Sequence, residues 1–311
     1  MRHIFIVNPV SGKADASGTL VPRIITAAKG LEAEYEVQLT EYPGHAVQLA
    51  RQAAQSGPVR LYACGGDGTL NEVLMGARES ETAEVACVPC GSGNDFVRNF
   101  GGGERFLDLP DLMQGHAVPI DLIETQYGIA AAICSAGLDA QVAYGIPKFR
   151  RLPLCGGSMA YNLSIAQCVC GRMGHKLRVT ADGEVLEDDF LMLAICNGCA
   201  YGGGFVAAPE ADMNDGELDL VLVKKISRLR MARVIGLYKS GAHIQNGRVA
   251  PEVADIITYK RVRQVELETL DGRPIVVTQD GECAPRNTLT AKVKPSAARV
   301  VLPKSWFERR A

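Results

Sequence analysis

The first 120 residues alternate between short apolar runs and amphipathic stretches, and this alternation limits the possible folds more than any other feature. "HIFIVN" (3–8), "YEVQLTE" (35–41), "VRLYAC" (59–64) and "EVACVPC" (84–90) have the pattern of strands. Helical patterns near residues 20–33 and 45–57 and after residue 68 separate these runs. Strands that alternate with helices predict a parallel sheet covered by helices. We therefore expect an α/β domain over residues 1–125.

The second half of the chain has a different pattern, in which strands dominate from about Ile129 onward. "KLRVTADGEVLEDD" predicts a hairpin around Asp182-Gly183, and "QVELETLDGRPIVVTQDGE" carries another Asp-Gly turn. Two helical stretches interrupt, near residues 158–171 and 227–241. This predicts a mainly antiparallel, β-rich second domain over residues 126–299, with residues 300–311 expected to pack back on the first domain.

One stretch of the first domain, "YACGGDGTLNEVL" (62–74), combines an apolar strand, a glycine turn and a helical stripe. Its glycines leave backbone N–H groups uncovered, and "TLNE" matches a capping box with Thr69 as N-cap and Glu72 at the third helical position. Free N–H groups at a helix N-terminus bind anions. A tight strand-to-helix turn without a ligand is the alternative reading of this stretch alone.

Asp67 lies inside that turn, and its carboxylate would repel phosphate unless a cation lay between them. A nucleotide with Mg²⁺ resolves the conflict. Ligands of open α/β sheets bind at the carboxyl ends of the strands. The turns after Val7, Cys64 and Cys90 are therefore expected to gather along one edge of the sheet.

Bulk composition excludes several classes of protein. The net charge is −2, so no overall charge favours nucleic acid as a partner. No apolar run approaches the roughly 18 residues of a membrane span, and "MRHIFIVNPVSGK" lacks the layout of a signal peptide, which predicts a cytoplasmic location. The ten cysteines are then expected to be mostly reduced. A zinc site made by the Cys87/Cys90 and Cys196/Cys199 pairs is an alternative to small buried side chains.

Four motifs stand in a specific order: "NPVSGK" (8–13), "GGDGTLNE" (65–72), "PCGSGNDF" (89–96) and "QDGE" (279–282). Together they resemble the catalytic domain shared by diacylglycerol kinases, sphingosine and ceramide kinases and bacterial soluble lipid kinases, over nearly the whole chain. The resemblance implies an NAD kinase/diacylglycerol kinase-like fold and ATP-dependent phosphorylation of a membrane lipid hydroxyl, first of all diacylglycerol to phosphatidic acid. An NAD kinase-like phosphotransferase and a non-catalytic nucleotide-binding regulator are the alternatives.

The resemblance also implies a set of ATP-binding residues, which the family places in the cleft between its domains. The matching positions are Asn8, Pro9, Val10, Ser11, Gly12, Thr40, Gly66, Asp67, Gly68, Thr69, Leu70, Asn71, Glu72 and Ser92.

Catalytic and metal-binding carboxylates follow from the same resemblance. The family's general base falls in the "DGE" turn, at Asp280 or Glu282, and the family favours the glutamate position; Asp67 is the third catalytic candidate. A kinase that phosphorylates an alcohol needs such a group to take the hydroxyl proton. "APEADMNDGELDL" (208–220) resembles the segment that binds a structural Mg²⁺. Its ligands would be the carboxylate of Asp215 and the backbone carbonyls of Asp212 and Glu217.

A lipid kinase must reach a bilayer, so peripheral and transient membrane contact is expected. The candidates are a basic helix with an apolar stripe at residues 231–238 and the mixed apolar and basic stretch "IPKFRRLPLCGG" (146–157). A packed helix with solvated charges is the alternative for the first. Whether the chain forms a homodimer is left open.

Overall fold

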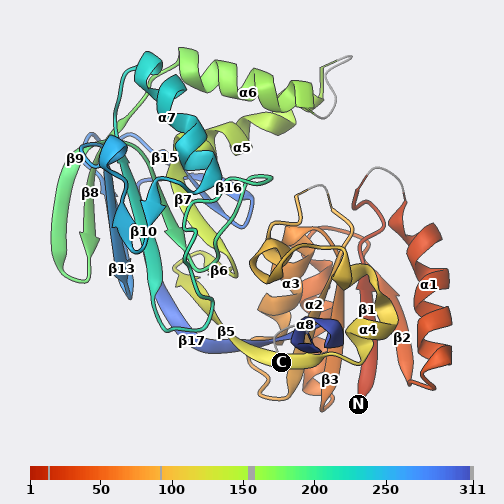
Figure 1. Cartoon of the computed structure of the whole chain (residues 1–311). Helices are drawn as coiled ribbons and strands as arrows, with labels where there is room; N and C mark the ends of the chain where they lie inside the picture. The colour runs from red at the N-terminus through yellow and green to blue at the C-terminus, as the bar shows by residue number, and fades with distance from the viewer. Residues whose placement is uncertain (13–14, 92, 153–157, 309–311) are drawn as a thin grey trace. The chain divides into compact units, whose positions relative to one another are not determined.

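The protein is described by a computed structural model that covers residues 1–12, 15–91, 93–152 and 158–308 (Figure 1). The chain divides into two compact units. Unit 1 consists of Met1–Leu122 and Pro295–Ala311, and unit 2 of Ile123–Lys294. Two strands, β5 (His116–Thr125) and β17 (Thr288–Leu302), run from one unit into the other. Within the described ranges, no helix is both long and apolar enough to span a bilayer.

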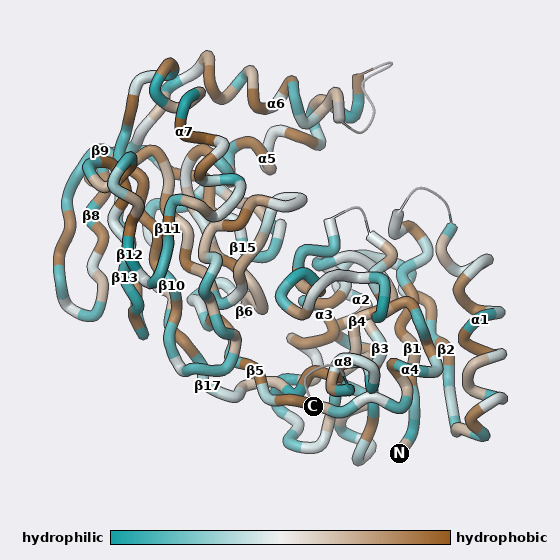
Figure 2. The backbone as a smooth tube through the Cα atoms, in the orientation of Figure 1, coloured by the Kyte–Doolittle hydropathy of each residue, from teal (hydrophilic) through white to brown (hydrophobic). Residues whose placement is uncertain are grey.

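Unit 1 contains a parallel sheet in the order β17-β4-β3-β1-β2. Its own strands are β1 (Arg2–Val7), β2 (Tyr35–Leu39), β3 (Val59–Gly65) and β4 (Ala83–Pro89). Every residue of β4 and nearly every residue of β3 is buried, as expected for strands covered on both faces. Figure 2 shows these central strands as apolar. The predicted α/β domain is confirmed.

The helices of unit 1 are distributed over the sheet as right-handed crossovers require. They are α1 (Ala16–Gly30), α2 (His45–Gln55), α3 (Asp67–Ala77), α4 (Leu109–Met113) and α8 (Lys304–Glu308), with 3₁₀ helices η1 (Phe96–Phe100) and η2 (Arg105–Leu107). The connection from β1 to β2 runs opposite to those from β2 to β3 and from β3 to β4. Right-handed connections therefore place α2 and α3 on one face and α1 on the other. In agreement, α2 packs against α3, and α1 against α4.

Unit 2 is mainly antiparallel, as predicted. Its sheet strands are β6 (Gly128–Ala130), β7 (Ile133–Gly137), β8 (His175–Ala181), β9 (Glu184–Cys196), β10 (Leu218–Lys224), β13 (Ile257–Val262), β14 (Gln264–Thr269), β15 (Ile275–Gln279) and β16 (Glu282–Arg286). A separate small hairpin joins β11 (Ile244–Gln245) to β12 (Arg248–Val249). The hairpin predicted at Asp182-Gly183 joins β8 to β9, and both turn residues have positive φ (46° and 88°).

The long strand β9 organises the two cores of unit 2. Its first half pairs with β8, and its second half lies between β7 and β10. One apolar cluster contains side chains such as Leu193, Leu220 and Val265, while the second contains Ala194, Val221 and Tyr238. Adjacent residues of β9 and β10 therefore belong to different cores, because successive strand side chains point to opposite faces.

The described residues of unit 2 also form three α-helices and one 3₁₀ helix. They are α5 (Leu138–Arg150), α6 (Ser158–Cys170), α7 (Arg228–Ser240) and η3 (Pro251–Val253). The two predicted helical stretches correspond to α6 and α7. In Figure 1, α5, α6 and α7 lie together beside one end of the unit 2 strands, at the top of the view.

Candidate active site

Three glycine turns meet at the carboxyl ends of β1, β3 and β4. Gly12 has φ +88°, and a Cβ atom there would lie 2.7 Å from the carbonyl oxygen of Cys90. A Cβ atom on Gly91 would lie 2.5 Å from the Cα atom of Gly66. Neither position has room for a larger residue unless the backbone moves. The predicted gathering of the turns after Val7, Cys64 and Cys90 is confirmed.

Hydrogen bonds join these turns to one another. The Asn8 amide donates to the carbonyl of Cys64 (3.0 Å), and its side-chain Nδ2 donates to Oγ1 of Thr69 (3.1 Å). The Cys90 amide donates to the carbonyl of Gly65 (2.8 Å). At the end of β2, the Thr40 amide donates to the carbonyl of Val7 (2.9 Å). The edge of the sheet is thus one continuous backbone surface.

The N-terminus of α3 lies within this surface and has no side-chain cap. Gly66 is the N-cap residue, and the first intrahelical bond runs from the Leu70 amide to the Gly66 carbonyl (3.1 Å). The N–H groups of Asp67, Gly68 and Thr69 consequently have no acceptor among the described residues. Three free N–H groups at the positive end of a helix dipole can bind an anion such as phosphate.

The capping box predicted for α3 is wrong, because the helix begins two residues before the proposed N-cap. Thr69 is buried, and its hydroxyl bonds the side chain of Asn8. The carboxylate of Glu72 instead accepts from the amides of Gly44 (3.0 Å) and Ala46 (3.2 Å) at the start of α2. The side chains of Thr69 and Glu72 therefore hold neighbouring segments together.

Among the described residues, only one carboxylate oxygen of Asp67 accepts a hydrogen bond. Its Oδ1 accepts from the Phe96 amide (3.1 Å). Its Oδ2 lies 3.0 Å from the position that a Cβ atom on Gly93 would take, and Oδ2 of Asp95 lies 3.7 Å from that same position. Gly93 thus separates two carboxylates. Carboxylate oxygens are the ligands that Mg²⁺ prefers, so Asp67 and Asp95 fit a Mg²⁺-bound nucleotide.

Asp95 was not among the residues predicted from the sequence. Its Oδ1 accepts from Nε of Arg98 (3.1 Å). The signal that could have found it is its place in the third glycine motif, three residues after Ser92, at the same sheet edge as Asp67.

The remaining nucleotide candidates are partly described. The side chain of Val10 is 87% exposed, and its amide donates to Oδ1 of Asn8 (3.2 Å). The Ser11 amide donates to the Asn8 carbonyl (3.2 Å), and the Pro9 carbonyl accepts from Ala16 (3.1 Å). Leu70 is buried and Asn71 half-buried. Ser92, another predicted ATP-binding residue, lies outside the described residues.

In unit 2, Asp280 and Gly281 form the two-residue turn between β15 and β16, with φ values of +45° and +97°. The Asp280 carboxylate accepts hydrogen bonds from the amides of Ala131 (2.5 Å), Ala132 (3.1 Å) and Ile133 (2.9 Å). Its own amide donates to the Ile133 carbonyl (3.0 Å). Asp280 therefore fixes the link between β6 and β7 to the hairpin turn.

Glu282 has the opposite environment. It opens β16, pairs with Gln279 across the hairpin, and is exposed. No hydrogen bond or ion pair joins its side chain to another described residue. Of the two carboxylates in the "DGE" turn, Glu282 is thus the one that is open to accept a proton.

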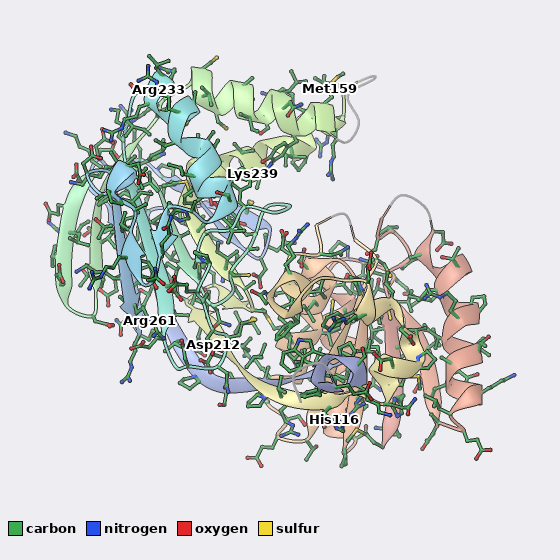
Figure 3. All side chains as sticks on the ribbon, in the orientation of Figure 1. His116, Met159, Asp212, Arg233, Lys239 and Arg261 are labelled. Carbon is green, nitrogen blue, oxygen red and sulfur yellow. The ribbon has the colours of Figure 1, made fainter. Side chains whose placement is uncertain are left out.

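The acidic segment at residues 210–217, before β10, forms ion pairs with the side chain of Arg261. Oδ2 of Asp215 forms an ion pair with Arg261, whose guanidinium also lies 2.9 Å from Glu217. Oδ1 of Asp215 accepts from the Glu217 amide (3.0 Å), and Oδ1 of Asp212 accepts from Asn214 (3.0 Å). Figure 3 labels Asp212 and Arg261. A structural Mg²⁺ at this segment stays a prediction, and it would have to displace Arg261 from Asp215.

Among the described residues, no three or more His, Cys, Asp or Glu side chains lie together in a group that could hold a metal ion. The described cysteines are free thiols. Cys87 and Cys196, the first members of the two Cys-x-x-Cys pairs, are buried, and burial raises their pKa.

Both halves of the chain match known domains. Residues 2–125 match the diacylglycerol kinase catalytic domain. Residues 132–302 match the YegS C-terminal NAD kinase beta sandwich-like domain. The chain belongs to the diacylglycerol kinase family.

Individual relatives agree with this family. A diacylglycerol kinase of Staphylococcus carnosus is 25% identical over 296 residues, covering 94% of this chain and 92% of the relative. A probable YegS-like lipid kinase of Chromohalobacter salexigens is 32% identical over 278 residues, covering 86% and 83%. A crystal structure of a putative diacylglycerol kinase from Bacillus anthracis has a TM-score of 0.73 at 22% identity and covers 98% of each chain. The last likeness shows the fold.

This member of the diacylglycerol kinase family also has a titratable network that the sequence analysis missed. Asp139 lies in the first turn of α5, and its Oδ2 accepts from the hydroxyl of Ser135 (2.6 Å). Burial raises the pKa of Asp139 to about 6, although the bond from Ser135 opposes the shift. The Oδ1 atom of Asp139 is buried and accepts no hydrogen bond from a described residue. The nearby hydroxyl of Tyr201 lowers the pKa of Asp139, against the larger effect of burial. The available signal was a lone aspartate after a strand-ending glycine, Gly137.

Proposed function

We propose that this protein is an ATP-dependent lipid kinase that transfers the γ-phosphoryl group of ATP to the hydroxyl of a membrane lipid, first of all diacylglycerol. The observation that carries the proposal is the uncapped N-terminus of α3. Its three free N–H groups lie where three glycine turns meet, beside an aspartate with one open oxygen. This combination suits a polyphosphate that arrives with a divalent cation.

In the proposed complex, unit 1 binds ATP. The N–H groups of residues 67–69 bind phosphate oxygens, and the turns at Asn8–Gly12 and at Thr40 border the nucleotide together with Ser92. Asp67, with Asp95, would hold Mg²⁺, which when bound neutralises charge on the transferring phosphoryl group. The side chains of Thr69, Leu70 and Glu72 hold the turn in place rather than contact the nucleotide, because they are buried or hydrogen-bonded to neighbouring segments.

In the proposed chemistry, unit 2 supplies the base. The acceptor hydroxyl oxygen forms a bond to the γ-phosphorus while the bond from that phosphorus to the bridging β–γ oxygen breaks, and ADP leaves. The hydroxyl proton moves to the carboxylate of Glu282, which later releases it to water. Asp280 is a positioning residue, since its two oxygens are occupied by three backbone amides.

The names of the relatives support a lipid acceptor, because they are a diacylglycerol kinase and a probable lipid kinase. A lipid acceptor also implies work at a membrane surface from the cytoplasm, with transient attachment. Two alternatives to a lipid kinase are distinguished by the experiment below: phosphorylation of NAD, and nucleotide binding without turnover.

The test is an acceptor panel with the purified full-length protein, Mg²⁺ and ATP. Diacylglycerol, phosphatidylglycerol, sphingosine, NAD and no acceptor are compared, and mass spectrometry identifies the product. We expect phosphatidic acid from diacylglycerol. Phosphorylation of NAD alone would make the protein an NAD kinase-like enzyme, and binding of ATP without any product would make it a regulator.

A variant pair tests the phosphate-binding turn directly. Gly66 has φ −93°, which a valine can adopt, and a Cβ atom there would lie 3.4 Å from Gly91. Gly66→Val should fold but cover the turn, so ATP affinity measured by calorimetry should fall at least tenfold. Gly18→Val is the matched control, because a Cβ atom at Gly18 meets nothing within 4 Å. Equal affinities of the two variants would refute the binding turn.

A further inference from the structure

Helix α6 contains no charged residue, and both of its sides carry apolar side chains. Its inward residues are buried or half-buried: Ala160, Tyr161, Ser164, Ile165, Cys168 and Val169. Its outward residues are exposed: Met159, Asn162, Leu163, Ala166, Gln167 and Cys170. A helix that carries apolar side chains on every side and no charge is typical of a protein core or of a lipid surface. Only one side of α6 is covered by the described residues.

The outward side has its apolar residues at its centre. At about 100° per residue, Met159, Leu163, Ala166 and Cys170 fall within about 60° of one another, with the uncharged Asn162 and Gln167 at the edges. Met159 is 52% exposed and Leu163 is 36% exposed. Figure 3 labels Met159 on α6, and Figure 1 shows α6 alongside α5. A solvated helix would normally carry charges at the centre of this side.

The end of α5 and its C-cap residue, which precede α6 in the chain, add positive charge. Lys148, Arg150 and Arg151 are exposed, and none of them has an ion pair with a described residue. Ser164 of α6 donates to the carbonyl of Val142 of α5 (2.6 Å), so the two helices pack along each other. The only carboxylate on either helix is Asp139, whose oxygens are buried or bonded to Ser135.

Helix α7, the first of the two candidates from the sequence, packs part of its apolar stripe against unit 2 itself, while Ile235 of that stripe stays 43% exposed. Its Met231, Val234 and Tyr238 pack in the second apolar core. The guanidinium of Arg228 donates to carbonyls at the end of α6, including Val169 (2.6 Å), and Arg230 forms a two-bond ion pair with Asp255 (2.6 and 2.7 Å). Lys239 lies over the ring of Phe205, 5.6 Å from its centroid.

We propose that the outward side of α6, flanked by Lys148, Arg150 and Arg151, is the surface on which this protein docks to an anionic lipid bilayer. Apolar side chains of an interfacial helix enter the boundary between headgroups and acyl chains. Flanking cations are attracted by anionic headgroups, at about 1 kcal/mol each. The absence of exposed carboxylates on α5 and α6 favours an anionic bilayer over a protein partner with mixed charges. The proposal extends the proposed function, which needs an acceptor from a membrane.

Vesicle co-sedimentation of the full-length protein tests the surface without requiring turnover. Binding is compared between phosphatidylcholine vesicles and vesicles with 30% phosphatidylglycerol. We expect Leu163→Gln to weaken binding to the anionic vesicles about tenfold, and Lys148→Glu with Arg151→Glu to weaken it at least tenfold at low salt. Leu229→Gln on α7 is the matched control, because Leu229 is 65% exposed and lies outside the proposed surface; it should bind as wild type does.

A second measurement places the contact. Leu163→Trp should shift its fluorescence to shorter wavelength on anionic vesicles, while Leu229→Trp should not. Melting temperatures and the sedimentation coefficient of each variant check the fold and the oligomeric state. Loss of binding in Leu229→Gln but not in Leu163→Gln would move the surface to α7. A wild-type dimer that Leu163→Gln dissociates would mean that a second copy covers α6. Equal binding to both vesicle types would also overturn the proposal.

Turnover separates this proposal from the proposed function. With a short-chain, water-soluble diacylglycerol, Leu163→Gln should retain wild-type turnover, since no docking is needed. If wild type binds anionic vesicles through α6 but phosphorylates no lipid, the docking surface stands and the kinase proposal fails.

Discussion

Two Asp-Gly pairs belong to the candidate site motifs, Asp67-Gly68 at the start of α3 in unit 1 and Asp280-Gly281 at the β15–β16 turn in unit 2. The carboxylates of these two aspartates have different hydrogen-bond partners. Asp67 gives one oxygen to a backbone amide and leaves the other without a donor among the described residues. Asp280 gives both oxygens to three amides. The same dipeptide thus marks an open ligand position in one unit and a structural bond in the other.

The difference follows from what surrounds each turn. Asp67 begins helix α3, and the first N–H groups of a helix have no intrahelical acceptor; because α3 has no side-chain cap, the N–H groups of residues 67–69 stay without an acceptor among the described residues. The turn at Asp280 lies against residues 131–133, whose amides need acceptors. Asp280 supplies them, and the open carboxylate of unit 2 is therefore its neighbour Glu282.

The largest expected effect tests whether Glu282, the open carboxylate of unit 2, acts as the general base. Glu282→Gln keeps the shape of the side chain but removes the ability to take a proton. We expect kcat to fall by about 10²–10⁴-fold, the usual contribution of general base catalysis. ATP affinity and melting temperature should stay as in wild type, because the side chain makes no bond to the described fold. Glu252→Gln, at another exposed glutamate of unit 2, controls for the loss of charge.

Asp67→Ala tests the open oxygen of unit 1. Turnover with saturating Mg²⁺ should fall by about 10³-fold, because charge stabilisation at the transferring phosphoryl group is lost. The melting temperature should change little, since among the described residues the variant loses one hydrogen bond, the bond from the Phe96 amide. A variant with near-normal kcat in steady-state assays would show that Asp67, like Asp280, serves the fold alone.

Asp280→Asn tests the structural half of the comparison. An amide group in place of the carboxylate puts N–H donors against the amides of residues 131–133 and leaves some of them unpaired. Unpaired buried groups cost about 1–3 kcal/mol each, so the free energy of unfolding should fall by about 3 kcal/mol in urea titrations. If Asp280→Asn unfolds as wild type does but loses turnover, Asp280 is the base and the two roles are reversed.

The sequence predicted the α/β and antiparallel units, because strand and helix periodicity and Asp-Gly turns are local signals. It also predicted that the glycine turns gather at one sheet edge. It could not predict where α3 begins, because Gly66 rather than a polar side chain is the N-cap. It could not separate Asp280 from Glu282, because the amides that bind Asp280 come from about 150 residues earlier in the chain. Asp139 was missed for the same reason: burial raises its pKa, and burial is a property of the packed unit.

Asp139 adds a third kind of carboxylate to the comparison, one that titrates near neutral pH. Its folded-state pKa of about 6 lies above the usual 3.8. The folded state therefore binds this proton more tightly than the unfolded state, and the stabilisation is present below about pH 4 and is lost as the pH rises through 6. Between pH 4 and pH 7, wild type should lose about 2 kcal/mol relative to Asp139→Asn. Parallel urea titrations of both proteins measure this difference, and a constant difference across the range would contradict the buried carboxyl.

The smallest expected effect concerns Glu72, the carboxylate of unit 1 that most resembles Asp280. Both of its oxygens accept from backbone amides, Gly44 and Ala46, at the start of α2. This bond pattern caps a helix from another element, and losing a cap costs about 1 kcal/mol. Glu72→Gln keeps one acceptor oxygen, so the free energy of unfolding should fall by about 1 kcal/mol while kcat stays within twofold of wild type. If Glu72 capped α3, the same change would instead disturb the phosphate-binding turn and lower the affinity for ATP. Calorimetry of ATP binding alongside urea titration separates the two: weaker ATP binding without a loss of stability would return Glu72 to the nucleotide site, and the reverse result would place it with Asp280 among the carboxylates that hold the fold.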